Sequence, residues 1–150
     1  MPSTYTNLLY HLVFSTKERR PFITPELQHE LHPYRGGIIL DARGVPLEIG
    51  GVADHVHILA KLPATLSIAD ALRLIKSNSS KWAGERPDVV RTFAWQEGYA
   101  AFTVSKSQVD IVREYIQNQE EHHRKKTFKQ ELVSLLKKND IEYDEKYLWD

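Results

Sequence analysis

The amino-acid sequence predicts an α+β fold, an antiparallel sheet of the ferredoxin-like or RNA-recognition-motif-like kind with helices packed on one face. The first observation is the order of the predicted elements: strand, helix, strand, strand, helix, strand, helix, which is the split βαβ pattern. The second is the length of 150 residues, with 41% hydrophobic and 27% charged side chains, which suits one globular domain. The third is the absence of repeats, low-complexity segments and long linkers. We therefore expect a single domain over 1–150, with a core over about 1–126 and a C-terminal helix and tail over about 127–150.

Four segments are predicted as strands because they are rich in β-branched, aromatic and other apolar residues. They are residues 4–16, 45–52, 55–62 and 93–104. Gly50 and Gly51 indicate a bend or turn between the second and third segments, and Gly98 interrupts the fourth.

Four further segments carry helix signals. They are residues 23–34, 67–82, 107–125 and 128–138. Thr24 stands in the capping position of the first helix with Pro25 directly after it, and the Gly36–Gly37 pair is expected to close that helix. Ser67 and Asp70 form a pair resembling a capping box at the start of the second helix.

The sequence "DHVHIL" places two histidines on one strand. Side chains alternate along a strand, so the aliphatic residues at even positions from Val56 to Leu62 share one face, which we expect to be core. His55 and His57 then lie side by side on the other face, which the predicted fold leaves available. Two paired imidazoles can coordinate one metal ion, although paired histidines on a strand are also common as ordinary polar-face residues.

Tyr115 and Gln119 are four residues apart and therefore project from the same helical face. In a structural interpretation, the tyrosine packs against the sheet with the glutamine beside it. In a chemical interpretation, the tyrosine oxygen is a nucleophile that forms a covalent intermediate. Gln119 would then supply an oxygen to the metal that the two histidines hold.

Composition excludes several classes of site and partner. The chain has no cysteine, so disulfides and thiolate metal sites are excluded. Its formal net charge of zero argues against strong non-specific binding of nucleic acid over the whole surface, although residues 122–129 form a basic run. No apolar run approaches a membrane-spanning length and no signal-peptide pattern begins the chain, so we expect a cytoplasmic protein with no membrane partner.

Five sequence blocks resemble the single-tyrosine HUH transposases of the simplest bacterial insertion sequences. HUH stands for histidine, hydrophobic residue, histidine, and the family includes relatives associated with REP repeats. In chain order the blocks are "YHLVFSTKERRPFI", "DHVHIL", "IKSNSSKWA", "WQEGYAAFTVS" and "VREYIQNQEEHH". The tail "IEYDEKYLW" is also similar to that of the family. The motif "HVH" alone is unspecific, but five blocks in this order are highly specific.

The resemblance implies that Tyr115 is the nucleophile and that the metal is Mg²⁺ or Mn²⁺. The implied protein ligands are His55, His57 and Gln119. Asp54, directly before the motif, is an outer or alternative ligand in this interpretation. His11, on the first strand, would have a structural or DNA-contacting role.

The implied reaction is cleavage and rejoining of single-stranded DNA at hairpin-marked element ends through a 5′-phosphotyrosine. The implied assembly is a homodimer, whose active sites can be composite. Cations that could contact DNA are Lys17, Arg19, Arg20, Arg73, Lys76, Lys81, Arg124, Lys125 and Lys126. Trp82 or Tyr99 could stack on bases.

Three alternatives remain open from the sequence. The first is a domesticated relative with the same chemistry that acts on chromosomal palindromic repeats. The second is a non-catalytic nucleic-acid-binding module, which is disfavoured because no pair of stacking aromatics stands beside the histidines. The third is a metal-dependent hydrolase that uses activated water and would survive the loss of Tyr115.

Overall fold

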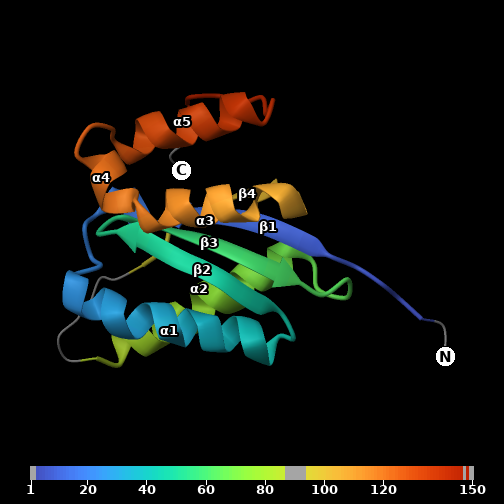
Figure 1. The fold of residues 1–150 in the computed structure, drawn as a ribbon. Helices are drawn as coiled ribbons and strands as arrows, with labels where there is room; N and C mark the ends of the chain where they lie inside the picture. Colours follow the sequence, from blue (N-terminus) through green and yellow to red (C-terminus); the bar gives the residue numbers. More distant parts are fainter. Residues whose placement is uncertain (1–2, 87–93, 147, 149–150) are drawn as a thin grey trace.

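A four-stranded antiparallel sheet forms the centre of the molecule (Figure 1). The computed structural model describes residues 3–86, 94–146 and 148. The strands are β1 (Leu8–Ser15), β2 (Val45–Val52), β3 (His55–Leu62) and β4 (Ala100–Thr103), in the spatial order β2-β3-β1-β4. Each strand runs antiparallel to its neighbours. The predicted α+β fold is therefore confirmed.

Helices cover both faces of this sheet (Figure 1). On one face lie α1 (Pro25–Asp41) and α2 (Ile68–Gly84). On the other lie α3 (Val109–Gln117), α4 (Gln119–His123) and α5 (Phe128–Lys138). Short 3₁₀ turns, η1 (Lys17–Arg19) and η2 (Lys106–Gln108), follow β1 and precede α3. The expectation that the histidine face is left available was wrong, because the C-terminal helices pack on it.

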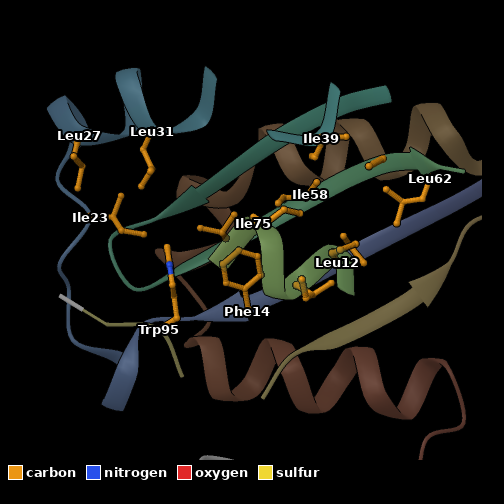
Figure 2. Packing of buried hydrophobic residues seen from close by; sticks show 14 residues of the cluster. Leu12, Phe14, Ile23, Leu27, Leu31, Ile39, Ile58, Leu62, Ile75 and Trp95 are labelled. Atoms are coloured by element: carbon orange, nitrogen blue, oxygen red, sulfur yellow. The ribbon is translucent and has the colours of Figure 1, made fainter. Parts of the chain in front are cut away.

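The main hydrophobic core lies between the sheet and the pair α1 and α2 (Figure 2). Leu12 and Phe14 of β1 and Ile58 of β3 point into it and meet Leu31 of α1 and Ile75 of α2. All of these side chains are buried, and full burial of one such side chain stabilises the fold by about 1.5–3 kcal/mol. This core confirms the aliphatic face that alternation predicted for β3.

Helix α1 begins as predicted but runs further. The side chain of Thr24 accepts a hydrogen bond from the backbone N–H of Leu27, 3.2 Å away. The Gly36–Gly37 pair does not end the helix, which continues to Asp41. Each glycine inside a helix costs only about 1 kcal/mol, and the fully buried Ile39 beyond them offsets that cost. The chain leaves the helix at Arg43, whose φ of 68° is left-handed.

Gly50 and Gly51 lie inside β2, so the bend predicted there is wrong; the turn falls at residues 53–54. Gly50 instead leaves room for a neighbouring helix. A Cβ atom added there would stand 2.7 Å from the carbonyl oxygen of Ile116 and 2.8 Å from its Cγ2 atom. The missing side chain therefore lets α3 approach β2 closely.

The helix predicted over residues 107–125 is broken in two. It starts as the 3₁₀ turn η2, and Asn118, with φ −98° and ψ 23°, separates α3 from α4. The strand predicted over 93–104 is regular only in β4; Trp95 forms an isolated bridge with Thr16, and Phe93 lies outside the described residues. The first strand begins at Leu8 rather than at residue 4.

In the described part of the chain, no helix combines the length and the apolar character that crossing a membrane requires.

Candidate active site

His55 and His57 occupy the start of β3 and have no solvent exposure. Alternation along the strand explains why both point away from the main core. Their burial comes from the C-terminal helices: the ring of Phe128, the first residue of α5, stacks on His55 with centroids 4.3 Å apart. The sequence placed the two histidines on the correct face, but the expectation that they stand outside a core was wrong.

The Nε2 atoms of both histidines converge on one carboxylate. Oε1 of Glu131 lies 3.2 Å from Nε2 of His55 and 3.0 Å from Nε2 of His57. One ligand atom from each of these three buried residues lies within 4.8 Å of the others, an arrangement that could hold a metal ion. Imidazole nitrogen and carboxylate oxygen are both good ligands for divalent cations.

The second nitrogen of each imidazole is also engaged. Nδ1 of His55 lies 2.7 Å from Oδ1 of Asp54, and Nδ1 of His57 lies 2.7 Å from Nε2 of the buried His11. Such contacts fix the orientation of a metal-binding imidazole and tune its basicity. Asp54 and His11 therefore lie behind the two histidines, on the side away from the convergence point.

Tyr115 and Gln119 reach the same cluster despite the break at Asn118. The hydroxyl of Tyr115, at the end of α3, donates a hydrogen bond to Oε2 of Glu131. Oε1 of Gln119, at the start of α4, lies 3.0 Å from Nε2 of His55, and its Nε2 donates to Oε2 of Glu131 at 3.1 Å. Gln119 is buried, whereas Tyr115 is half-buried and retains access to solvent.

Glu131 is a central residue of the site that was not predicted from the sequence. It is 3% exposed and lies on α5, in the segment predicted only as a short amphipathic helix. A signal was present, because Glu131 shares the apolar stripe of that helix with Phe128, Leu132 and Leu135, at i+3 and i+4 spacing. A charged residue on a buried stripe requires a partner. His123 of α4 is a further partner, with Nε2 3.2 Å from Oε1 of Glu131.

The charges of the cluster follow from burial and from these contacts. Burial alone would raise the pKa of Glu131, but hydrogen bonds from the surrounding histidines prevail and hold this pKa far below its usual range. Burial would also lower the pKa of His55, yet Asp54 and Glu131 raise it to about 9. The pKa of Tyr115 is raised, first by burial and then by the negative charge of Glu131.

The imidazoles of His57 and His11 have lowered pKa values. Burial lowers the pKa of His57, against the opposing effect of Glu131. Burial, together with the nearby His57, lowers the pKa of His11 to about 3. These directions favour an ion pair between His55 and Glu131 and a protonated hydroxyl on Tyr115.

A cavity of about 310 Å³ leads to the tyrosine between α3, α5 and β4. His11 and Tyr115 line it from the side of the cluster, and Phe102 contributes an apolar wall. Lys138 and Asn139, at the end of α5, add polar groups to its lining. The nucleophile candidate is thus accessible from outside, whereas the histidines are not exposed.

Of the cations predicted to contact DNA, two groups are close in sequence to residues of the cluster. η1 carries Lys17 and Arg19 directly after β1 and is followed by Arg20, and the backbone N–H of Thr16 donates to the carbonyl of Asp54. Residues 124–126 join α4 to α5. The structure does not bring the remaining cations, Arg73, Lys76 and Lys81, to this place, because α2 lies on the opposite face of the sheet (Figure 1).

Several predicted DNA contacts have other partners in the structure. Nζ of Lys76 donates to the backbone carbonyls of Gln96, Glu97 and Gly98, so it holds the segment before β4. Arg20, Arg73 and Arg124 form exposed ion pairs with neighbouring carboxylates, contacts that are worth little and that an anionic ligand could replace. The ring of Trp82 stacks on Tyr34, whereas Tyr99 is exposed.

Comparison with known proteins identifies the family. Residues 4–119 match the model of the family described as "Transposase IS200 like". Over 127 residues the chain is 28% identical to the transposase for insertion sequence element IS200 of Salmonella typhimurium strain LT2, covering 81% of this chain and 82% of the relative. The corresponding transposase of Salmonella typhi matches to the same extent.

Two solved structures share the fold. A protein of Deinococcus radiodurans R1, assigned as a transposase, superposes with a TM-score of 0.62 at 22% identity, covering 79% of this chain and 95% of that one. A REP-associated tyrosine transposase bound to a REP hairpin superposes with a TM-score of 0.60 at 14% identity, covering 82% and 73%. Because the family model spans most of the chain, the protein belongs to the IS200-like transposase family.

Proposed function

We propose that this IS200-like transposase cleaves and rejoins single-stranded DNA at hairpin-marked element ends, with Tyr115 as the nucleophile and a divalent cation, Mg²⁺ or Mn²⁺, in the site. One observation carries the proposal. The hydroxyl of Tyr115 and the amide of Gln119 meet the two imidazoles of the "HVH" motif in one cluster. These groups come from three separate elements, and a merely structural tyrosine does not require a metal-type pair of histidines beside it.

The donor set fits a divalent cation. The imidazoles of His55 and His57 and the amide oxygen of Gln119 would hold it: Nε2 of both histidines lies beside the same carboxylate oxygen, and Oε1 of Gln119 lies 3.0 Å from Nε2 of His55. A bound divalent cation would supply Lewis-acid stabilisation for the charge that develops on the scissile phosphate. Asp54 and His11 would keep the two imidazoles oriented from behind.

The covalent step belongs to Tyr115. Its phenolic oxygen attacks the phosphorus, the bond from phosphorus to the 3′-oxygen breaks, and the tyrosine proton is given up while the leaving oxygen becomes a 3′-hydroxyl. The product is a 5′-phosphotyrosine. In the reverse step a 3′-hydroxyl attacks this linkage and rejoins the strand. The phosphodiester energy is kept throughout, so no nucleotide cofactor is required.

Features around the cluster support a DNA substrate. The cavity beside Tyr115 would give a strand access to the nucleophile, and the cations of η1 and of residues 124–126 directly follow β1 and α4, which carry residues of the cluster. The relative of known structure that was bound to a REP hairpin is a precedent for hairpin recognition on this fold. We also propose a homodimer. The residues of the cluster meet within one chain, so the dimer would not be needed to complete this site.

The test is whether Tyr115 becomes covalently linked to DNA. The chain is incubated with Mn²⁺ and an end-labelled single strand that carries a hairpin, and adducts are separated under denaturing conditions. We expect an adduct with the wild-type chain and none with Tyr115→Phe, while hairpin binding changes little. Tyr143→Phe, a half-buried tyrosine of the tail, is the matched control and should keep the adduct. Cleavage that persists without Tyr115 would instead identify a hydrolase that uses activated water.

A further inference from the structure

Glu131 lies outside the part of the chain that the family model matches, which ends at residue 119. The structure nevertheless brings it to the centre of the site. Thr127 and Gln130 form a reciprocal capping box that starts α5. The buried Phe128 and Leu136 then anchor the helix against β1 and β4, so that the side chain of Glu131 is directed inward.

The two oxygens of Glu131 have separate surroundings. Oε1 faces three imidazoles, those of His55, His57 and His123, all at 3.0–3.2 Å. Oε2 accepts hydrogen bonds from the hydroxyl of Tyr115, the proposed nucleophile, and from the amide of Gln119. One carboxylate therefore joins the metal-type histidines to the tyrosine.

The spacing around Oε1 is that of ligands on one cation. Two ligand atoms at about 2.1 Å from an octahedral ion lie about 3.0 Å apart. Oε1 is 3.0 Å from Nε2 of His57 and 3.2 Å from Nε2 of His55. Carboxylate oxygen is also the ligand that Mg²⁺ and Mn²⁺ prefer.

We propose that Glu131 of α5 is itself a ligand of the divalent cation through Oε1 and orients the hydroxyl of Tyr115 through Oε2. The active site then consists of the "HVH" strand, the tyrosine helix and α5. Burying a carboxylate among imidazoles contributes little to stability by itself, because desolvation offsets the attraction. A role in holding the cation would explain why a carboxylate is buried at this place. The inference rests on the proposed function, because it assumes that Tyr115 is the nucleophile.

The first test measures cation binding without DNA. Wild type, Glu131→Gln and the exposed control Glu142→Gln are titrated with Mn²⁺ by calorimetry. Changing residues behind the ligands commonly costs about 10- to 100-fold in metal affinity, so replacing the charged carboxylate by a neutral amide oxygen, a weaker ligand, should weaken Mn²⁺ binding at least tenfold, and the control should bind as wild type. Wild-type affinity in Glu131→Gln would overturn the assignment, as would a wild-type chain that binds no Mn²⁺.

The second measurement uses the wild-type chain alone, in case the glutamine variant fails to fold. Hydrogen exchange of the backbone amides is compared with and without Mn²⁺. A cation held between β3 and α5 should slow exchange in α5 at least tenfold, as it does around His55 and His57. If Mn²⁺ slows exchange at the histidines but leaves α5 unchanged, Glu131 is not a ligand.

The orientation of Tyr115 is tested by single-turnover adduct formation at saturating Mn²⁺. Glu131→Gln should form the adduct at least tenfold more slowly than Glu142→Gln at equal hairpin binding, and equal rates would overturn this half of the proposal. The binding and exchange measurements involve no DNA. A chain that binds Mn²⁺ through Glu131 but forms no adduct at Tyr115 would therefore refute the proposed function and leave the ligand assignment intact.

Discussion

Replacing Gly50 by alanine should damage catalysis without touching any chemical group of the site. The Cβ atom added to β2 would stand 2.7 Å from the carbonyl oxygen of Ile116, where ordinary contacts begin at 3.4 Å. Relieving the overlap requires α3 to move away from β2 by about 0.7 Å, the difference between these distances. Because Tyr115 precedes Ile116 on the same helix, its hydroxyl moves with it.

Two magnitudes follow from this displacement. Inserting one carbon into a packed interface typically costs about 1–3 kcal/mol, so we expect Gly50→Ala to be less stable by that amount. A misplacement of about 1 Å at a reacting group costs about 10²-fold in rate. A shift of about 0.7 Å should therefore slow adduct formation by about 10- to 100-fold. Hairpin binding should change little, because β2 and α3 meet inside the fold.

The same substitution at Gly37 is the matched control. Nothing lies within 4 Å of a Cβ added there, and the position is inside α1. Gly37→Ala should therefore gain about 0.5–1 kcal/mol and cleave at the wild-type rate. Chemical denaturation gives the stabilities, and single-turnover adduct formation at saturating Mn²⁺ gives the rates. A Gly50→Ala chain as stable and as fast as Gly37→Ala would refute the close approach of α3 to β2.

Three further predictions follow from the same geometry. Mixing Tyr115→Phe with His57→Ala chains should restore no adduct formation, because the cluster assembles within one chain; recovered activity in a denaturing gel would instead indicate a composite site. Truncation after Lys126 removes α5, and a loss of both thermal stability and Mn²⁺ affinity is expected by calorimetry. The cation-free chain should have its highest melting temperature near pH 6.5. His55, with a pKa of about 9, stabilises the fold below pH 6.5, and this contribution is lost as the pH rises to 9. The pKa of His11 is lowered to about 3, so the fold becomes less stable as the pH falls from 6.5. Melting curves from pH 4 to 10 test this, and a melting temperature that does not fall toward pH 9 would contradict it.

Local patterns predicted most of the secondary structure correctly. Strand alternation gave β3 and its two faces, and capping signals at Thr24 and Ser67 gave the starts of α1 and α2, where both side chains accept hydrogen bonds from the backbone. The errors lie where packing decides. The glycines near residue 36 did not stop α1, because apolar residues beyond them reach the core. Asn118 interrupts a helix that periodicity alone would continue.

The candidate site was predictable only as far as its motifs extend. His57 and Glu131 are 74 residues apart, and no local pattern states that α5 returns to β3. The burial of both histidines depends on that return, which explains why we predicted from the sequence that they lie on an exposed face. Asp54, next to His55 in the chain, could be named from position, but the contact of His11 with His57 follows only from the register of β1 against β3.

The course of the chain after Tyr115 explains why one chain suffices for this cluster. α3 docks on its own sheet through Val109 and Ile116 and through the gap at Gly50, a fit that fixes where the tyrosine stands. The break at Asn118 then turns the chain so that the first residue of α4, Gln119, still reaches the histidines, and α5 returns beside α3 with its carboxylate. A composite site would require α3 to leave this packing, and α4 and α5 would have to follow it or give up their contacts. In the structure the contacts of Ile116 and Val109 are made within one chain, and we therefore predict chemistry within each chain even if two chains associate.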